Sequence, residues 1–432
     1  MPLRLTASHP EFDNDFGDFA AQRRDVNSNI TNIVSNIIAD VRARGDQALL
    51  EFTDKFDGLK FTSADQLRLS DGDLMEASNL VRDRELRALK HAAARIHSFH
   101  DKQLPPDMTY EDDVGVKLGV RWTPVEAVGI YVPGGTAAYP SSVLMNAIPA
   151  KVAGVKRLIM AVPPPEQTVN PLVLEAARLS GVDEIYRVGG AQAVAALAYG
   201  TETIVSVDKI TGPGNAYVTE AKRQVFGRVG IDMIAGPSEI LVVADAENDP
   251  SWIAADLISQ AEHDVSSQSV LITDSAAMAD AVSDAVNKLL SMLPRGEIAR
   301  ESWETHGCII LVANIEECVG LVNRLAPEHV ELAVQSSKSL SEKINNAGTI
   351  FLGHYTPEAV GDYVAGPNHV LPTSGNARFS SGLSTMDFMK RTTFVECDKK
   401  ALERIGPDAV TLANAEGLDA HALSVSMRLR KD

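Results

Sequence analysis

The stretch Ile240-Leu241-Val242-Val243-Ala244, followed by Trp252-Ile253-Ala254-Ala255-Asp256-Leu257-Ile258-Ser259-Gln260-Ala261-Glu262-His263, decides the fold class. The first run is short, apolar and rich in β-branched residues, which is typical of a buried strand. The second run is longer and places apolar residues at helical spacing. A strand followed by a helix of this length forms one βα unit, and repeated units of this kind predict a mainly parallel sheet.

The same alternation of strands and helices continues through most of the chain. Apolar runs and helical runs follow one another from Ala127 to Leu352, in two blocks at 127–237 and 238–382. We therefore predict an α/β protein with two Rossmann-like, incomplete, mainly parallel sheets.

The remaining segments complete the predicted domain organisation. Residues 1–24 are polar and predict an N-terminal arm with helical character. We assign 25–126 and 238–382 to a first, discontinuous α/β domain on the substrate side, and 127–237 to a second α/β domain on the cofactor side. Residues 383–432 are predicted to form a C-terminal tail.

Composition excludes several classes of function. The chain has 432 residues and 45% hydrophobic content, enough for more than one packed core. Its formal net charge of −18 disfavours nucleic acids and anionic membrane surfaces as partners. The cysteines are few and widely spaced, as expected in a reducing compartment, and exclude a thiolate-rich zinc site. The N-terminal residues lack a signal pattern, and no apolar run reaches the roughly 18–20 residues of a membrane span. We expect a cytoplasmic protein.

Gln260 and His263 are candidates for half of a metal site. Residues three apart on a helix share a face, so an amide oxygen and an imidazole nitrogen can point at one ion. A zinc site needs about four ligands, usually with an anion among them, so the other ligands must come from elsewhere in the chain. The competing interpretation is structural, because the helix dipole favours histidine at a helix C-terminus.

Three glycine-rich turns follow predicted strands, at 133–136, 189–192 and 212–215. Glycine lets the backbone approach a phosphate, and a helix N-terminus supplies N–H donors. In open α/β sheets, ligands bind at the carboxyl ends of strands. None of the turns has the Gly-x-Gly-x-x-Gly spacing. They are compatible with a non-standard nucleotide site or with ordinary turn chemistry.

Acidic and imidazole side chains elsewhere are further candidates. Glu328 and His329 open an apolar strand, where the imidazole could accept a proton and the carboxylate could orient or deprotonate water. Asp362 could supply an anionic metal ligand, and Glu416 and His421 flank a short loop near the C-terminus. Each is also typical of a turn or a solvated side chain, and residue pattern alone leaves both interpretations open.

A series of longer motifs occurs in a fixed order along nearly the whole chain. They are Gly129–Thr136, Ser141–Met145, Pro149-Ala150, Ala153-Gly154, Gly189–Ala193, Gly212–Asn215, Ala235–Glu239, Ser259–His263, Pro327–His329 and Asn368–Thr373. Together these motifs resemble the histidinol dehydrogenase family, and the N-terminal arm is the least diagnostic part.

The resemblance implies a zinc- and NAD-dependent oxidation of L-histidinol to L-histidine through L-histidinal, in the last steps of histidine biosynthesis. It implies one zinc ion per subunit and two NAD molecules reduced in turn. It also implies a homodimer with shared active sites, in which the C-terminal tail swaps between subunits.

The resemblance also implies a role for particular residues. The implied zinc ligands are Gln260, His263, Asp362 and His421, with His421 reaching the other subunit's site. The implied substrate contacts are these four together with Ser238, His329 and Glu416. His329 would act as general base, and Glu328 would activate water for oxidation of the aldehyde. The implied NAD contacts are Tyr131, Gln192 and Asn215.

Two other functions compete with this one. The main alternative is a paralogue of the same superfamily that oxidises another polar alcohol, such as sulfopropanediol. Glu416 and His421 favour histidinol, because they would contact its amine and imidazole. The second alternative is a non-catalytic metabolite-binding protein on the same scaffold, against which the intact Glu328-His329 pair argues.

Overall fold

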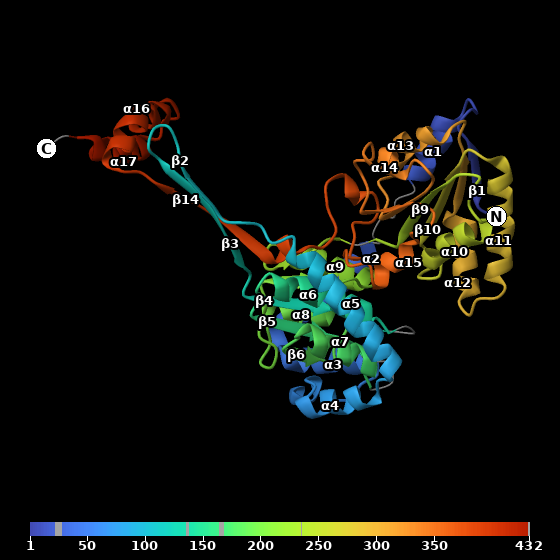
Figure 1. Cartoon of the computed structure of the whole chain (residues 1–432). Coiled ribbons are helices and arrows are strands. Elements are labelled where there is room, and N and C mark those ends of the chain that lie inside the picture. Colours follow the sequence, from blue (N-terminus) through green and yellow to red (C-terminus); the bar gives the residue numbers. More distant parts are fainter. Residues whose placement is uncertain (22–27, 135–137, 164–167, 235, 431–432) are drawn as a thin grey trace.

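The computed structural model describes residues 1–21, 28–134, 138–163, 168–234 and 236–430. Two bodies, each built on a parallel sheet, lie beside each other, and a long ribbon projects from one of them (Figure 1). The α/β class with two mainly parallel sheets is confirmed. Among the described helices, none combines the length and the apolar character needed to cross a bilayer.

The first body is built on a six-stranded sheet, here called the large sheet, with strand order β1-β11-β10-β9-β12-β13 and parallel pairing throughout. Its strands are β1 Leu3–Thr6, β9 Glu239–Ala244, β10 Gln268–Thr273, β11 Cys308–Leu311, β12 His329–Ala333 and β13 Thr349–Leu352. Its helices are α1 Phe12–Ala21, α10 Pro250–Ala261, α11 Ala276–Leu290, α12 Gly296–His306, α13 Cys318–Leu325, α14 Ser337–Ser341 and α15 Glu358–Tyr363. Apolar side chains of α1, α13 and α14 cover one face, and those of α10, α11 and α12 cover the other.

The second body is built on a five-stranded parallel sheet, here called the small sheet, with order β6-β5-β4-β7-β8. Its strands are β4 Ala127–Tyr131, β5 Arg157–Ala161, β6 Glu184–Tyr186, β7 Lys209–Thr211 and β8 Gly230–Ile231. Its helices are α2 Ser28–Arg44, α3 Asp46–Asp57, α4 Asp71–Leu80, α5 Asp83–Asp101, α6 Pro140–Val152, α7 Pro171–Ser180, α8 Gly190–Tyr199 and α9 Ala216–Val225. Alternate residues of β4 and β5 face opposite helical layers, as the two-residue period of a strand requires.

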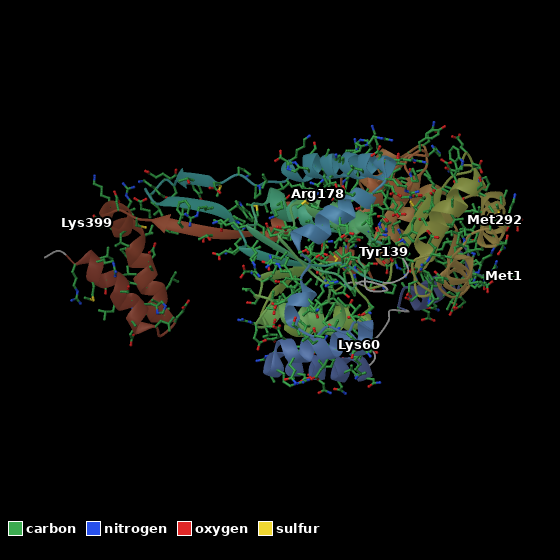
Figure 2. All side chains as sticks on the ribbon, turned by 90° about the horizontal axis from the view of Figure 1, so that it is seen from below. Met1, Lys60, Tyr139, Arg178, Met292 and Lys399 are labelled. Carbon is green, nitrogen blue, oxygen red and sulfur yellow. The ribbon has the colours of Figure 1, made fainter. Side chains whose placement is uncertain are left out.

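The ribbon is an antiparallel sheet with order β14-β3-β2. It consists of β2 Met108–Glu111, β3 Lys117–Pro124 and β14 Met389–Glu396, and β14 leads into the helix pair α16 Lys399–Ala415 and α17 Asp419–Leu429. Short 3-10 turns lie at Ala64–Leu67, Ile315–Glu317, Asn376–Arg378 and Thr385–Phe388. Lys399, at the start of α16, lies at the opposite end of the molecule from Met1 and Met292 (Figure 2).

The structure corrects part of the predicted domain organisation. Helices α2 to α5 pack against helices α6 to α9 of the second body, so this part of 25–126 belongs with 127–237 and not with 238–382. Residues 1–21 do not form a separate arm, because β1 pairs with β11 and α1 buries phenylalanines against the large sheet. An amphipathic helix shows in its sequence that it has an apolar stripe but not which sheet will cover it. The tail includes β14, which pairs with residues 117–124, and its exchange between subunits stays a prediction.

A buried ion pair fixes the turn after β7. Lys222 of α9 and Asp232 form an ion pair with both side chains almost fully buried. Lys222 Nζ donates to the carbonyl oxygen of Gly212 at 2.9 Å, and the N–H of Gly212 donates to Asp232 Oδ2 at 2.8 Å. The buried ion pair and its two hydrogen bonds to Gly212 therefore fix the turn that begins at Gly212.

Replacing Lys222 with methionine should destabilise the protein strongly, because Asp232 would be left charged and buried. Loss of one partner of a buried pair typically costs about 3–5 kcal/mol. Urea denaturation followed by circular dichroism measures the change. Lys338→Met, at an exposed position on α14, is the matched control and should shift the midpoint little. A cost below about 1 kcal/mol for Lys222→Met would show that the pair does not hold the turn.

Candidate active site

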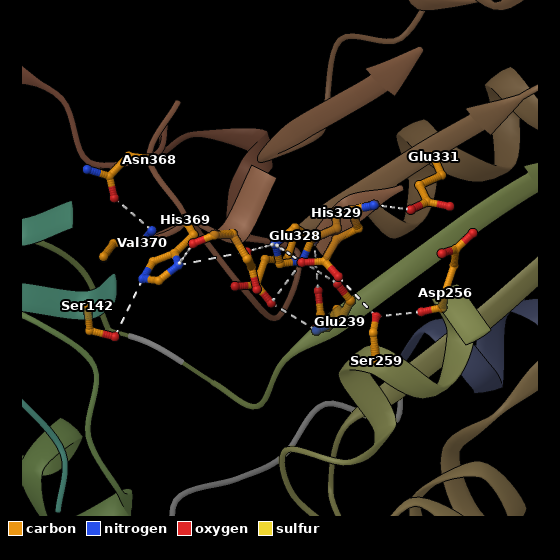
Figure 3. A network of polar contacts seen from close by, with 12 residues as sticks. Ser142, Glu239, Asp256, Ser259, Glu328, His329, Glu331, Asn368, His369 and Val370 are labelled. Carbon is orange, nitrogen blue, oxygen red and sulfur yellow. Dashed lines mark hydrogen bonds and ion pairs between the residues drawn. The ribbon is translucent and has the colours of Figure 1, made fainter. Parts of the chain in front are cut away.

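The candidate site lies at the edge of the large sheet where its strands begin. Strands β9 and β12 are parallel neighbours, with His329 opposite Ile240. Helix α10 returns the chain to this edge before β10, so Gln260 in its last turn and His263 beyond its end arrive beside the strand starts. Helix α15 carries Glu358 and Asp362 to the same place. Glu239, Glu328, His329 and His369 lie together there (Figure 3).

Hydrogen bonds between β9 and the start of β12 connect Glu239 with Glu328 and His329. The N–H of Glu239 donates to Glu328 Oε2 at 2.9 Å, and the N–H of Glu328 donates to Glu239 Oε2 at 3.3 Å. His329 Nδ1 lies 2.9 Å from the carbonyl oxygen of Glu239 and donates to it. This bond places the proton of a neutral imidazole on Nδ1 and leaves Nε2 as the acceptor.

The Nε2 atom of His329 faces a carboxylate pair. It lies 3.6 Å from Asp362 Oδ1 and 3.8 Å from Glu358 Oε1. Both Nε2 and Glu358 Oε1 are buried without a hydrogen-bond partner among the described atoms. Glu358 Oε2 accepts from the hydroxyl of Ser259 at 3.0 Å. The unpaired atoms therefore converge on one space beside Asp362.

Burial and charge shift the pKa values of these groups strongly. Burial raises the pKa of Glu328 to about 8, against the opposing effect of His329. Burial also raises the pKa of Glu358 to about 7. For His329, burial lowers the pKa, but the charges of Glu328, Asp362 and Glu358 outweigh it and bring the value to about 10. Burial raises the pKa of Asp362, but its imidazole neighbours hold the pKa well below the usual range.

Three of the four residues expected to bind zinc meet here. The side chain of Gln260 is buried and lies close enough to Glu358 to lower the pKa of that carboxyl, against the larger effect of burial. Burial lowers the pKa of His263. The negative charge of nearby Asp362 raises this pKa, but by less than burial lowers it. His369, which is partly buried, donates from Nδ1 to the carbonyl oxygen of Asp362 at 2.9 Å.

The donor set fits a divalent cation. One ligand atom each from His329, Glu358 and Asp362 lies within 4.8 Å of the other two. An amide oxygen from Gln260 and an imidazole from His263 add neutral donors, and mixed nitrogen and oxygen ligands suit zinc. A cation in this space would supply the partner that Glu358 Oε1 lacks.

The fourth expected ligand lies elsewhere. His421 is exposed on α17, and Glu416 is exposed at the end of α16, on the projecting tail far from α10 and α15 in this chain (Figure 1). Ser238, expected to contact substrate, lies beside Glu239, and its carbonyl oxygen accepts from Gln268. Within one chain the structure brings Ser238 to this edge but not His421 or Glu416.

The residues expected to contact NAD lie on the small sheet at the ends of strands. Tyr131 ends β4, and its hydroxyl accepts from the N–H of Gly190 at 3.0 Å. Gln192 on α8 is 1% exposed, and its Nε2 has no partner among the described atoms. Asn215 caps α9, because its Oδ1 accepts from the N–H groups of Tyr217 and Val218. Only the amide nitrogen of Asn215 is left to contact a ligand.

Close backbone contacts explain the glycines of these turns. A Cβ on Gly212 would lie 2.1 Å from the carbonyl oxygen of Tyr131, and its φ is +114°. A Cβ on Gly189 would lie 2.5 Å from Pro163. Of the first glycine-rich turn, at 133–136, residues 135 and 136 lie outside the described part of the chain. The remaining turns present bare backbone at the carboxyl edge of the small sheet, where α/β proteins bind nucleotides.

Sequence reasoning missed three residues of the site. Glu239 and Glu358 each contact the acid–imidazole pair, and His369 contacts Asp362. A signal for Glu358 was present: it lies four residues before Asp362 and just after Pro357, which places both carboxylates on one face of a helical turn. Glu239 gave no such signal, because its role depends on strand pairing.

The fold and this site define an α/β protein with a buried acid–imidazole pair beside a metal-compatible cluster. The family model described as histidinol dehydrogenase matches residues 20–429. The chain belongs to the histidinol dehydrogenase family.

Similar proteins cover nearly the whole chain. A curated histidinol dehydrogenase of Rhodospirillum rubrum is 60% identical over 432 residues, covering 100% of this chain and 99% of that protein. One from Ruegeria pomeroyi is 58% identical over 429 residues, with 99% of each chain covered. The crystal structure of histidinol dehydrogenase from Elizabethkingia anophelis matches with a TM-score of 0.94 and 39% identity, covering 99% of this chain and 98% of that one.

Replacing Asp362 with asparagine should lower the pKa of His329 from about 10, because one of the charges that stabilise the imidazolium is removed. The backbone bond from His369 to residue 362 is kept. The measurement is an NMR titration of the His329 ring in protein treated with a chelator. Glu262→Gln is the control, since Glu262 acts on His263 but is not among the charges that raise the pKa of His329. An unchanged pKa in Asp362→Asn would contradict the assigned electrostatics.

Proposed function

We propose that this protein is a zinc- and NAD-dependent dehydrogenase that oxidises L-histidinol to L-histidine through L-histidinal, in histidine biosynthesis. The observation that carries the proposal is the convergence of Glu328, His329, Asp362 and Glu358 at one buried point. Family membership supplies the substrate, and the geometry supplies roles for the side chains.

His329 is the proposed general base of both oxidation steps. Its Nδ1 is held by the carbonyl oxygen of Glu239, so its Nε2 can accept the proton of the substrate hydroxyl. A base must be unprotonated when it acts, and a pKa near 10 opposes this. A divalent cation held by Asp362 would offset that negative charge and lower the pKa of His329. Metal binding and base strength are therefore coupled in this site.

Glu328 is the proposed base for the water that adds to the aldehyde. It lies beside His329, with Oε2 held by the N–H of Glu239. Its raised pKa of about 8 keeps part of the population protonated near neutral pH. The carboxylate form grows as the pH rises through this value, so oxidation of the aldehyde is expected to become faster in alkaline solution.

Gln260, His263 and Asp362 would hold zinc, and Tyr131, Gln192 and the Asn215 amide would contact NAD. When bound, zinc would position nitrogen donors of the substrate, and NAD would accept the hydride. The cluster of buried carboxylates would then face a cation, which reduces their mutual repulsion.

The complete site requires a second copy of the chain. His421 and Glu416 lie on the projecting tail and do not meet the other site residues in one chain (Figure 1). In a homodimer with exchanged tails, each tail would bring these two side chains to the α10–α15 cluster of its neighbour. The proposal is therefore a homodimer with two shared sites.

Replacing Glu328 with glutamine should reduce oxidation of histidinal far more than oxidation of histidinol. A general base contributes about a hundred- to ten-thousand-fold in rate. Stopped-flow formation of NADH, with each substrate supplied separately, measures both steps, and the alkaline increase in the second step should vanish. Glu342→Gln, at an exposed position, is the control. Equal losses in both steps would refute the division of roles between Glu328 and His329.

Mixing two inactive variants tests the shared site. Chains with His421→Asn and chains with Glu328→Gln are each expected to form little L-histidine from L-histidinol, but a mixed dimer would hold one intact site. Random reassociation makes about half of the dimers mixed, which gives about a quarter of wild-type activity. Two variants that belong to the same side, Glu328→Gln and Asp362→Asn, are the control and should stay inactive when mixed. Recovery in neither mixture would refute the exchange of tails.

Substrate comparison separates the proposed function from its alternatives. The proposal predicts NADH formation with L-histidinol and little with sulfopropanediol at equal concentration. Preference for the sulfonated alcohol would identify a paralogous dehydrogenase, and tight histidinol binding without NADH would identify a binding protein.

A further inference from the structure

The stretch of chain that follows α15 attaches Asp362 to the second body. Helix α15 carries Asp362 and ends one residue later. The N–H groups of Val364 and Ala365 still donate to the carbonyl oxygen of Val360, at 2.9 and 2.8 Å. Residues 364–369, here called the connecting segment, then run from the large-sheet body along α5 and α6 of the small-sheet body.

Arg95 of α5 holds the first part of the connecting segment. Its Nε donates to the carbonyl oxygen of Val364 at 2.6 Å, and its Nη2 donates to that of Ala365 at 3.0 Å. Two donors from one planar guanidinium fix the orientation of the segment as well as its position. The next residue, Gly366, has a φ of +119°, and a Cβ there would lie 3.1 Å from the carbonyl oxygen of Arg95. The segment therefore lies directly on α5, with little room for a side chain at this point.

A second contact holds the far end of the connecting segment. His100 of α5 is fully buried, and its Nδ1 donates to the carbonyl oxygen of Ile96 at 2.8 Å, which leaves Nε2 as an acceptor. This Nε2 lies 3.4 Å from the amide nitrogen of Asn368, which also donates to the carbonyl oxygen of Met145 of α6 at 2.6 Å. The amide oxygen of Asn368 accepts from the N–H of Val370 at 2.9 Å (Figure 3). Both ends of the segment are therefore attached to helices of the second body.

These contacts bear on the metal-compatible cluster because its residues come from different parts of the molecule. Gln260 and His263 lie at the end of α10, within the large-sheet body. Asp362 is joined to the connecting segment by the chain itself and by His369, whose Nδ1 donates to the Asp362 carbonyl oxygen at 2.9 Å. A displacement of the segment would therefore move Asp362 and leave Gln260 and His263 in place.

We infer that Arg95 is a positioning residue of the metal site. Its two hydrogen bonds hold the connecting segment, and through it Asp362, where this carboxylate can share a divalent cation with the ligands from α10. The inference rests on the proposed zinc site and adds to it a residue that touches neither metal nor substrate. It also makes the arrangement of the two bodies a part of the site, because a ligand of one body is held in place by a helix of the other.

The sign of the effect separates positioning from simple electrostatics. Arg95 carries a positive charge, so its removal would strengthen the binding of a cation if charge alone mattered. Loss of the two hydrogen bonds instead frees the segment, and a cation that binds must then also order it, which weakens binding. A weaker metal site after the loss of a positive charge therefore identifies positioning.

The zinc affinity of Arg95→Met tests the inference without catalysis. Competition with a chromophoric chelator on the full-length protein measures it, and we expect binding at least about tenfold weaker than in the wild type. Arg95→Lys keeps the charge but cannot bond both carbonyl oxygens, so it should resemble Arg95→Met. Arg87→Met, at an exposed position about two turns earlier on α5, is the matched control and should bind zinc as the wild type does.

Unchanged or tighter zinc binding in Arg95→Met would overturn the inference, and so would wild-type affinity in Arg95→Lys or equal weakening in Arg87→Met. A wild-type protein that binds no zinc would instead refute the proposed zinc site, and the inference with it.

Hydrogen exchange in the metal-free protein, followed by mass spectrometry, is the second measurement. Residues 364–366 should exchange at least about tenfold faster in Arg95→Met than in the wild type, while α10 stays unchanged. Unchanged exchange at 364–366 would show that Arg95 does not hold the segment. Faster exchange throughout α10 as well would indicate a general loss of stability and would count against a positioning role.

Discussion

The parallel pairing of β9 with β12 is the constraint on which the site depends. It places Glu239 and Glu328 side by side at the strand starts, where each backbone N–H donates to the carboxylate of the other. The same pairing gives His329 Nδ1 the Glu239 carbonyl as its acceptor. One register shift would move these side chains to opposite faces of the sheet. The ring orientation of His329 is therefore set by main-chain geometry, before any ligand binds.

This packing leaves more negative charge at the site than the protein alone can balance. Glu328, Glu358 and Asp362 surround a single imidazole, and burial raises the pKa of two of these carboxyls. Glu331 and Asp256 extend the cluster, since Glu331 accepts from the N–H of Glu358 and lies close enough to Asp256 for each carboxyl to affect the pKa of the other. Buried like charges of this kind are retained where a cation or a proton joins them. A shared proton or a bound cation would therefore lower the electrostatic cost of the cluster.

Local pattern was enough to predict the fold class and the helix that carries Gln260 and leads to His263. Local pattern was enough because the spacing of apolar residues that is typical of a strand or a helix can be recognised within one continuous segment, as in β9 and α10. It failed for helices α2 to α5, whose apolar stripes fit either sheet, and for β1, whose partner β11 lies some three hundred residues later. Glu239 and Glu358 became site residues only through contacts between distant segments. The expected roles of Gln260, His263, Asp362 and His421 came from motif resemblance, and periodicity could not have supplied them.

The projecting tail exposes large apolar side chains that its own helices do not cover. Helices α16 and α17 pack mainly on each other, and large apolar side chains remain exposed on them, with Leu412 64%, Leu423 50% and Met427 59% exposed. A helix pair of this size on a narrow ribbon buries too little apolar surface to be stable alone. Monomeric proteins rarely expose such apolar groups in one place, and those that do usually cover them in an assembly. In the proposed dimer, the tail that carries His421 and Glu416 is thus the part of the chain that a second subunit would stabilise most. Stability and catalysis would then impose the same requirement, because the contact that covers the tail would also deliver its polar residues to the site.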